Sequence, residues 1–318
     1  MKIKSIVLPL VALTLASCGP GEDIDITIRT ISPAGAPTLA FYDQGDNVDF
    51  ATNSAPSNVL AEFQTNYYNA IIFDSVNALK SIKTHSLDFK LAKIITGGNF
   101  YLASIDKEEG QMPTAEDVVV SFGENLIPDL VYRKLCEHWG VVNQAHYVPS
   151  VSEALGVLKT GLYGGSPVDY VFIAQPALNA AIGDVSAATY GRVKVAKNIR
   201  SEWEAYSGQS AIPQAGLFLR LSQYDLDPAS FHDYIDGIDA RIEKAIDYPE
   251  VVKSIMDEYG DAQAQAARFG FNSNIMLTTQ SAGANGFGLV RSTEEVSVND
   301  FLTSLDLEIF DSSYFLDV

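Results

Sequence analysis

Five short segments of the sequence combine small residues with hydroxyl, amide or carboxylate side chains that can form hydrogen bonds. They comprise residues 32–37, 53–57, 74–77, 96–99 and 121–125. Glycine and alanine let a ligand approach the backbone closely, while Ser and Asn offer neutral hydrogen bonds. Each segment by itself is better explained as a helix N-cap, because Ser, Asn and Asp are preferred capping residues. If the five segments gather at one edge of a sheet, they would form a binding cleft. Both interpretations, helix caps and a binding cleft, stay open.

Motifs for catalysis or metal binding are not found in the sequence. The glycine-rich residues 161–165 lack the Lys-Ser/Thr of a P-loop, and Ser166 has no G-x-S-x-G frame. The histidines are His85, His138, His146 and His232. They show no H-E-x-x-H spacing and the chain has no C-x-x-C pair, so we predict neither a metal site nor a cofactor. The sequence favours a binding protein over an enzyme.

The pattern of apolar residues predicts the elements that would position these segments, because short β-rich runs alternate with helical patterns. Strands are expected at residues 25–32, 47–54, 69–75, 90–105 (two strands broken at Gly97-Gly98), 117–122, 169–174 and 214–220. Helices are expected at residues 36–44, 57–65, 76–83, 127–141, 150–161 and 175–182. This alternation predicts an α/β protein whose ligands bind at the carboxyl ends of parallel strands.

After Asp227 the pattern becomes helical. Helices are expected at residues 228–246, 248–260 and 296–307. An α/β part of this length followed by helices fits two lobes, with the helices packed back on the first lobe.

The composition is strongly acidic, with 40 Asp and Glu against 21 Lys and Arg and a net charge of −19. The electrostatic field of this negative charge repels the phosphate backbones of nucleic acids, and no cluster of Lys or Arg interrupts it. Nucleic acid is therefore not an expected partner. Solubility, or a salty habitat, explains the charge better than a preference for a cationic ligand does. Of the two cysteines, Cys136 lies in a helical pattern and is expected to be a buried small hydrophobe.

The N-terminus has the pattern of a secretory leader. Lys2 and Lys4 precede an apolar run at residues 6–15, which is shorter than the about 20 residues that a membrane-spanning helix needs. The tetrapeptide ending at Cys18, Leu-Ala-Ser-Cys, resembles the bacterial lipobox. That resemblance implies a signal peptide at residues 1–17, lipidation of Cys18, and a tether at residues 18–23 that anchors an extracytoplasmic protein to a bacterial membrane. An ordinary secretory signal or an uncleaved anchor is the alternative.

Several segments together resemble one protein family. They are residues 127–141, 148–161, 168–182 and 212–220, together with residues 33–41 and 271–279. Their order is similar to that in the extracytoplasmic solute-binding lipoproteins of ABC importers. The most similar group includes binders of nitrate, alkylsulfonates, taurine and thiamine or its pyrimidine precursor. The resemblance covers nearly all of the chain after the leader.

The resemblance implies a two-lobed type II periplasmic-binding-protein-like fold in which C-terminal helices pack on lobe one. Lobe one would comprise residues 24–104 plus 215–318 and lobe two residues 105–214, with hinges near Ser104 and Gln214. The protein would be a monomer that captures a small solute between the lobes and delivers it to an ABC permease. Gln175 stands where the family has a glutamate, so a neutral amide replaces a charge there.

The ligand suggested by the residues is a neutral or cationic ring compound, such as a thiamine-like vitamin or a pyrimidine. None of the predicted cleft segments contains an arginine, which a sulfonate or nitrate would favour. Phe100-Tyr101 and Phe122 are candidates for stacking on a planar ring. Asp74 is a candidate counter-ion for a cation, although a helix N-cap is the commoner role for such an aspartate.

The complete set of expected ligand-binding residues is Ser32, Gly35, Ala36, Asn53, Ser54, Asp74, Ser75, Asn77, Gly98, Asn99, Phe100, Ser121, Phe122, Gly123, Gln175 and Gln214. Two alternatives to transport remain. One is an enzyme on the same fold, similar to chorismate dehydratase or a pyrimidine synthase, although a lipobox is unusual for such enzymes. The other is a surface lipoprotein that has lost transport.

Overall fold

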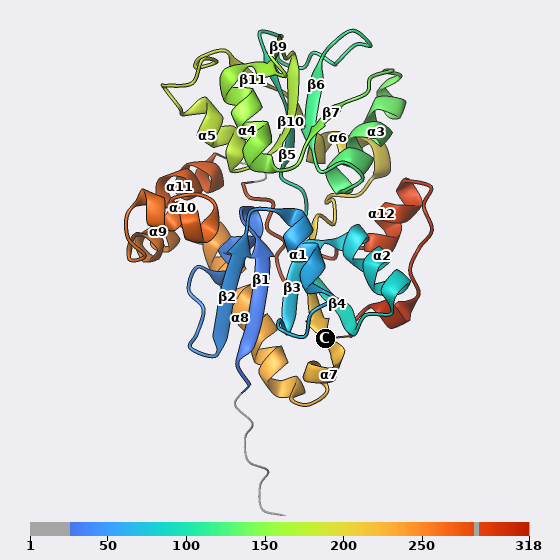
Figure 1. Ribbon diagram of the computed structural model, residues 1–318, viewed down its shortest axis with the longest axis vertical. Coiled ribbons are helices and arrows are strands. Elements are labelled where there is room, and N and C mark those ends of the chain that lie inside the picture. The colour runs from blue at the N-terminus through green and yellow to red at the C-terminus, as the bar shows by residue number, and fades with distance from the viewer. Residues whose placement is uncertain (1–25, 283–285, 318) are drawn as a thin grey trace, which may run out of the picture.

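The computed structural model describes residues 26–282 and 286–317, which form two α/β lobes stacked end to end (Figure 1). Each lobe is built on its own five-stranded sheet. The two-lobed α/β fold predicted from the sequence is therefore confirmed. The predicted signal peptide, Cys18 and the tether lie outside the described residues.

The sheet of lobe one has the strand order β2-β1-β3-β12-β4. Its strands are β1 Ile28–Pro33, β2 Val48–Asn53, β3 Ala70–Asp74, β4 Phe89–Thr96 and β12 Ala215–Arg220. β1 runs parallel to β2 and β3, whereas β12 runs antiparallel to β3 and β4. The carboxyl ends of β1, β2 and β3 therefore meet at one edge of the sheet, and this edge faces lobe two (Figure 1).

A helical segment follows each of these three parallel strands. The segments are the 3-10 helix η1 Ala36–Phe41 and the α-helices α1 Pro56–Glu62 and α2 Ser75–His85. In α2 the buried residues Val76, Leu79 and Ile82 recur at helical spacing and belong to the hydrophobic core. The apolar periodicity of the sequence thus fixes which face of this helix meets the sheet.

The segment after β1 differs from the helix predicted over residues 36–44, because it forms only the short η1. Arg241 explains why the helix stops. Its Nε donates to the carbonyl oxygen of Ala40 at 2.6 Å and its Nη1 donates to that of Asp43 at 3.3 Å. These bonds satisfy carbonyl groups at the end of η1 from outside the segment, so no further helical turn is needed to pair them.

The sheet of lobe two has the strand order β11-β5-β10-β6-β7. Its strands are β5 Phe100–Ile105, β6 Val119–Phe122, β7 His146–Val148, β10 Tyr170–Ala174 and β11 Val193–Asn198, with a small hairpin of β8 Leu162–Tyr163 and β9 Ser166–Pro167. Its helices are α3 Ile127–Trp139, α4 Val151–Thr160, α5 Ala177–Ile182 and α6 Ile199–Ser207. Cys136 on α3 is buried, as predicted, and 4 % exposed.

The chain crosses from lobe one to lobe two at residues 97–99. β5 pairs with β10 and β11, so it belongs to lobe two. The sequence-based boundary and hinge near Ser104 therefore lie too late in the chain, and the double glycine at Gly97-Gly98 marks the crossing. The break between two strands was visible in the sequence, but an apolar strand does not reveal which sheet it joins. The return to lobe one is complete at Ala215, where β12 begins.

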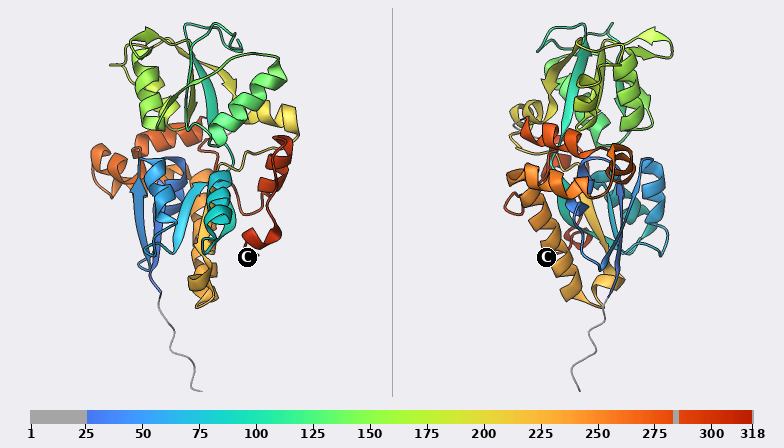
Figure 2. Two further views of the ribbon diagram at one scale, coloured as in Figure 1. Left: turned by 45° about the vertical axis from the view of Figure 1, so that its right-hand side comes forward. Right: turned by 90° about the vertical axis from the view of Figure 1, so that its left-hand side faces the viewer.

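The C-terminal part of the chain is helical. Its elements are α7 Leu221–Tyr224, α8 Pro228–Asp247, α9 Pro249–Asp257, α10 Ala262–Phe269, α11 Ser273–Ser281, α12 Val298–Ser304 and the 3-10 helix η2 Ser312–Tyr314. α8 packs against η1, and α9 packs against α8 and α11, so α8 to α11 gather on lobe one (Figure 2). The sequence pattern predicted α8, α9 and α12 but missed α10 and α11.

The last helix also contacts lobe two. The ring of Phe301 on α12 lies 5.0 Å from that of Trp203 on α6, and Tyr206 donates a hydrogen bond to the carbonyl oxygen of Ser304 at 2.9 Å. Figure 2 shows α12, in red, beside α6, in yellow. The expectation that the C-terminal helices pack on lobe one therefore holds for α8 to α11, while α12 joins the two lobes.

The first crossing segment is tightly packed against Gly288. The amide of Gly97 donates to the carbonyl oxygen of Gly288 at 2.6 Å. Gly288 has a φ of +65°, and a Cβ added there would lie 2.7 Å from the carbonyl oxygen of Gly98. Both the backbone conformation and the available space therefore require glycine at this position.

We expect Gly288→Ala to lower the free energy of unfolding by roughly 2 kcal/mol, because it adds left-handed strain and a steric clash. Urea unfolding followed by circular dichroism measures this change. Gly45→Ala is the control, since a Cβ at Gly45 meets no atom within 4 Å. Equal stability of the two variants would show that the crossing segment is not tightly packed.

Candidate functional site

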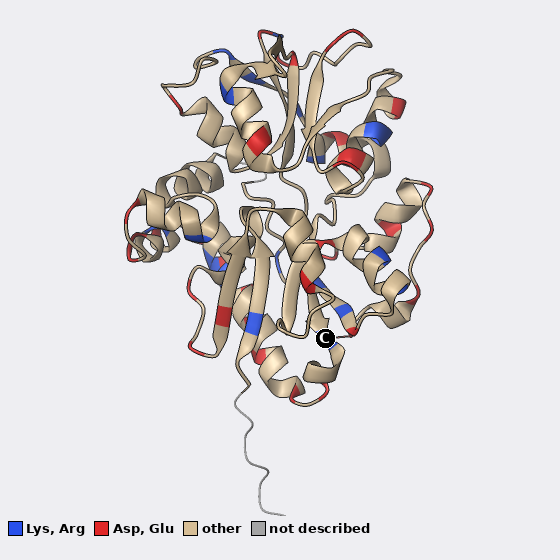
Figure 3. Cartoon of the chain, in the orientation of Figure 1, with Lys and Arg blue, Asp and Glu red and all other residues tan. Residues whose placement is uncertain are grey.

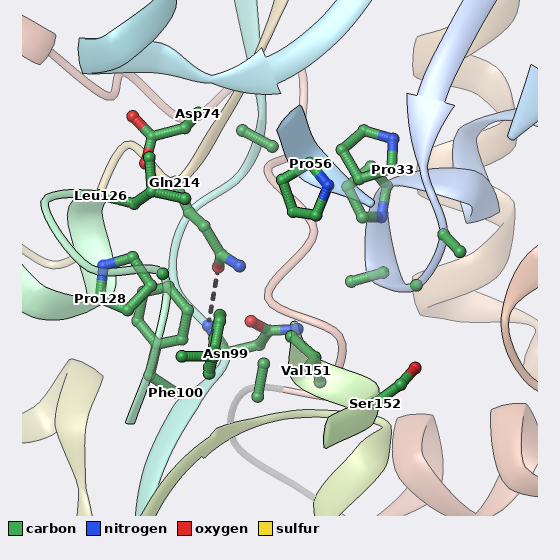
Figure 4. Close-up of a pocket in the computed structure, with 18 of the residues that line it drawn as sticks. Pro33, Pro56, Asp74, Asn99, Phe100, Leu126, Pro128, Val151, Ser152 and Gln214 are labelled. Atoms are coloured by element: carbon green, nitrogen blue, oxygen red, sulfur yellow. Dashed lines mark hydrogen bonds between the residues drawn. The ribbon is translucent and has the colours of Figure 1, made fainter. Parts of the chain in front are cut away.

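A cavity of about 150 Å³ lies between the two lobes. Lobe one contributes the residues that follow β1, β2 and β3, and lobe two contributes the ends of β6 and β10 and the starts of α3 and α4. Figure 4 shows ten of the lining residues with labels, from Pro33 and Pro56 on one side to Phe100 and Pro128 on the other. The carboxyl ends of parallel strands thus form this site, as the alternation of strands and helices predicted.

Most of the lining is apolar and rich in proline. The lining prolines are Pro33, Pro37, Pro56, Pro128, Pro149 and Pro176. Pro37, Pro56 and Pro128 stand in the first turn of η1, α1 and α3. Because proline has no N–H group, these helix starts present fewer free donors to the cavity than helix N-termini usually do.

The polar part of the lining is small and carries one ionisable group. It consists of Ser54, Asp74, Asn99, Ser152, Gln175 and Gln214. Among the described residues that line the cavity, none is Lys, Arg or His. Acidic residues are otherwise spread over both lobes and the C-terminal helices (Figure 3). The net charge of the chain is therefore not concentrated at the cavity.

Asp74 caps one helix in each lobe. One carboxylate oxygen accepts from the amide of Asn77 in α2 at 2.9 Å, and the other accepts from the amide of Ile127 in α3 at 2.8 Å. Burial raises the pKa of Asp74 above its ordinary value, although these hydrogen bonds act in the opposite direction. Of the two roles considered for Asp74, the structure shows the capping role, extended across the boundary between the lobes.

A further hydrogen bond, made by an amide side chain, joins the lobes beside Asp74. Asn77 Nδ2 donates to the carbonyl oxygen of Asn125 at 3.1 Å. On another side of the cavity, Asn179 Nδ2 on α5 donates to Thr279 Oγ1 on α11 at 3.1 Å. The lobes are thus held around the cavity by a few polar contacts in addition to the packing of α12.

Three residues with amide side chains are connected on the cavity wall by hydrogen bonds between side chain and backbone. The backbone N–H of Asn99 donates to Gln214 Oε1 at 3.3 Å (Figure 4), and Asn99 Nδ2 donates to the carbonyl oxygen of Gln175 at 2.6 Å. The side chain of Gln175 is engaged with Asn179, because its Oε1 accepts from the amide of Asn179 and its Nε2 donates to Asn179 Oδ1. Gln175 therefore orders the start of α5.

The aromatic residues predicted to stack on a ligand are packed against each other. The rings of Phe100 and Phe122 lie 6.1 Å apart, and that of Phe172 lies 5.5 Å from Phe100. Phe100 and Phe122 line the cavity while belonging to the core of lobe two. Tyr101 does not line it, because neighbouring residues in a strand point to opposite faces.

The structure brings ten of the predicted site residues to the cavity wall. They are Gly35, Ala36, Ser54, Asp74, Asn99, Phe100, Phe122, Gly123, Gln175 and Gln214. The other predicted residues, which do not line this cavity, are Ser32, Asn53, Ser75, Asn77, Gly98 and Ser121.

Hydrogen bonds within the protein account for most of the predicted residues that do not reach the cavity. The hydroxyls of Ser32 and Ser121 each donate to the carbonyl of the next residue. Asn53 Oδ1 accepts from the amide of Ala55, and Ser75 Oγ donates to the carbonyl of Pro213. These side chains order the turns that shape the site, but none of them is a helix N-cap. η1, α1 and α3 begin without a side-chain cap, and α2 is capped by Asp74.

The sequence analysis missed one edge of the site, at the start of α4. Pro149, Val151 and Ser152 line the cavity there. The signal was present, because Ser150 follows a short strand and precedes a helical pattern, and it caps α4 through the amide of Glu153. The rule that was applied to the other five segments would have found it.

The cavity opens into a wider hollow of about 540 Å³ between α1 and the start of α4. The two spaces share Ser54, Pro56, Phe73, Gly123, Leu126 and Pro149. Glu124 and Glu153 line the hollow but not the cavity. The path past Ser54 therefore leads from a hollow with two glutamates to a cavity whose single ionisable side chain, among the described lining residues, is Asp74.

No family model matches the sequence, and no curated protein matches it. Among solved structures, an ABC transporter protein from Parabacteroides distasonis is 14% identical, with a TM-score of 0.58, and the match covers 92% of this chain and 99% of that one. The alkanesulfonate-binding protein SsuA from Xanthomonas axonopodis, bound to MOPS, is 9% identical, with a TM-score of 0.60 and coverage of 87% and 89%.

The Candida albicans CA3427 gene product, described as exhibiting the generic periplasmic binding protein structural fold, is 8% identical, with a TM-score of 0.54 and coverage of 91% and 93%. The chain has the periplasmic-binding-protein fold. At such low identities the similarity establishes this fold and leaves the solute open.

In the described part of the chain, no helix is both long and apolar enough to cross a membrane. Within the same residues, no group of three or more His, Cys, Asp or Glu side chains is arranged to hold a metal ion.

Replacing Asp74 with Asn should reveal the raised pKa of this carboxyl group. Because the folded protein binds this proton at a higher pH than the unfolded chain, the stability contributed by Asp74 rises as pH falls. The free energy of unfolding of the wild type minus that of Asp74→Asn should therefore increase between about pH 7.5 and about pH 5. Urea unfolding at both pH values measures it.

Asp74→Ser provides a second reference that cannot titrate, and the difference between wild type and this variant should show the same trend. A difference that stays constant or shrinks as the pH is lowered would contradict the raised pKa.

Proposed function

We propose that the protein is the extracytoplasmic solute-binding component of an ABC importer, which captures a small solute between its lobes and presents it to a permease. The observation that carries this proposal is the cavity at the ends of the strands, lined by both lobes. Solved structures with the same fold are described as an ABC transporter protein and as an alkanesulfonate-binding protein, which supports the proposal.

The contacts between the lobes support capture by closure. Asp74 to Ile127, Asn77 to Asn125 and Asn179 to Thr279 are single hydrogen bonds across the boundary around the cavity. Such bonds can be exchanged for bonds to water when the lobes separate. A hinge motion around residues 97–99 and the segment before Ala215 would then admit and release the solute.

The size of the cavity supports a solute with a single ring. A volume of about 150 Å³ is comparable to an engineered protein cavity that holds benzene. Of the two ligand types considered from the sequence, a pyrimidine-sized compound fits this space better than the two-ring thiamine does. The apolar wall would bury the faces of the ring, and the few amide groups would orient it.

We also propose that the protein is anchored to the outer face of a bacterial membrane through lipid on Cys18. The lipobox-like residues before Cys18 support this proposal. The body would then work as a monomer close to the permease.

Cys18→Ser should abolish incorporation of radiolabelled palmitate in a bacterial host and release the protein from the membrane fraction, because the modified thiol is absent. The chain has only two cysteines, so Cys136→Ser is the matched control and should keep both the label and the membrane location. Membrane attachment of Cys18→Ser equal to that of the wild type would contradict lipid anchoring.

Filling the entrance should block solute capture without disturbing the fold. Ser54 is exposed and lines both the cavity and the outer hollow, so Ser54→Trp places a large ring at the entrance. Native mass spectrometry of the gently purified wild type should show a bound small molecule, and Ser54→Trp should lose it. Asn58→Trp is the control, because Asn58 is exposed on α1 and lines neither space.

Retention of the same molecule by Ser54→Trp would place the solute outside the cavity. Conversion of the bound molecule by the wild type would favour an enzyme. A wild type that carries no molecule and shows no change in small-angle X-ray scattering with pyrimidines would contradict the proposed function.

A further inference from the structure

One hydrogen-bond acceptor on the cavity wall is buried and unused. Asn99 is 1 % exposed and lines the cavity. Its Nδ2 and its backbone N–H both donate to protein oxygens, but within the described part of the chain its Oδ1 has no hydrogen-bond partner. Buried polar atoms in proteins are nearly always paired, so an acceptor left free at a ligand cavity points to a donor on the ligand.

The orientation of the Asn99 amide follows from its partner. Nδ2 lies 2.6 Å from the carbonyl oxygen of Gln175, and a carbonyl oxygen can only accept. The nitrogen must therefore be on that side, and the free atom must be the oxygen. This assignment rests on chemistry, since a flipped amide would bring two acceptors together.

Gln214 is oriented by the same reasoning. Its Oε1 accepts from the backbone N–H of Asn99, so its Nε2 must point elsewhere. Figure 4 shows this nitrogen directed away from Asn99, toward the side of the cavity where Pro56 lies. Both residues line the same cavity, so its wall offers an acceptor on Asn99 and a donor on Gln214.

We propose that Asn99 Oδ1 and Gln214 Nε2 together determine specificity, by binding a neutral solute that carries an adjacent hydrogen-bond donor and acceptor. An amide, a lactam or the edge of an oxidised pyrimidine has this arrangement. The inference rests on the proposed function and deepens it, because it names the class of solute that the cavity takes.

The same wall disfavours oxyanions. A sulfonate or nitrate has only acceptors and would place a negative oxygen against Asn99 Oδ1. The described residues lining the cavity include no Lys or Arg to compensate, and prolines remove donors at the helix starts. The Asp74 carboxylate on the same wall adds further repulsion.

Cations are not specifically favoured either. Both oxygens of Asp74 already accept hydrogen bonds from the amides of Asn77 and Ile127. Asp74 is also the single ionisable side chain among the described residues of the lining. The remaining polar groups are neutral, so recognition depends on matching hydrogen bonds and not on charge.

The test uses three small probes with the wild-type protein, dialysed free of bound solute, in isothermal titration calorimetry. 2-Pyridone is a single-ring lactam with adjacent donor and acceptor, N-methyl-2-pyridone lacks the donor, and methanesulfonate is an oxyanion. We expect 2-pyridone to bind, N-methylation to weaken binding at least about tenfold, and methanesulfonate not to bind. This comparison requires no variant and so does not depend on the folding of one.

Gln214→Glu tests the donor directly. A glutamate keeps the oxygen that accepts from the backbone N–H of Asn99 and replaces Nε2 with a second acceptor oxygen. This part of the wall then matches a ligand with two hydrogen-bond donors. We expect binding of 2-pyridone to weaken at least about tenfold and that of protonated 2-aminopyridine, which has two adjacent donors, to strengthen. Gln175→Glu adds the same charge to the cavity wall at a residue whose side chain is held by Asn179, and it should not reverse the preference.

Three results would overturn the inference while leaving the proposed function intact. The first is methanesulfonate binding more tightly than 2-pyridone, and the second is equal affinity for 2-pyridone and its N-methyl form. The third is the same reversal of preference in Gln175→Glu as in Gln214→Glu, which would show that charge alone decides. If no probe binds and the purified protein carries no solute, both the inference and the proposed function fail.

Discussion

The arrangement of the two lobes depends on the Asp74 carboxylate, because it accepts hydrogen bonds from the first turns of α2 in lobe one and α3 in lobe two. Burying a carboxylate is costly, and the raised pKa of Asp74 reflects that cost. The amide donors offset part of it, since they would otherwise be unpaired at a buried boundary. The same bonds that hold the lobes together remove Asp74 from the task of balancing a cationic ligand.

With Asp74 committed to structure, the chemistry of the cavity falls to neutral groups. The wall combines prolines and aromatic rings with a few amides, and the amides are themselves ordered by the backbone of the crossing segment. Gln175 shows how such a group can line a site and still serve the fold, because both ends of its amide bind Asn179. Asn99 differs, since among the described residues its side-chain oxygen has no hydrogen-bond partner.

The strong negative charge of the chain and the chemistry of its cavity are separate properties. Asp74 is the single acidic residue among the described residues that line the cavity, whereas acidic residues are spread over both lobes (Figure 3). A charged exterior keeps a protein soluble without taking part in recognition. The charge therefore gives no reason to seek a cationic solute, although Glu124 and Glu153 line the outer hollow.

The sequence by itself determined the α/β alternation, the strand break at Gly97-Gly98 and the loops that approach the cavity, because periodicity and capping are local properties of a chain. Only the tertiary structure decided that β5 joins the second sheet and that Asp74 reaches Ile127, which is 53 residues away. It also decided that Tyr101 turns from the cavity while Asn99 keeps a free oxygen. Such outcomes depend on which distant groups packing brings into contact, and no local pattern records them.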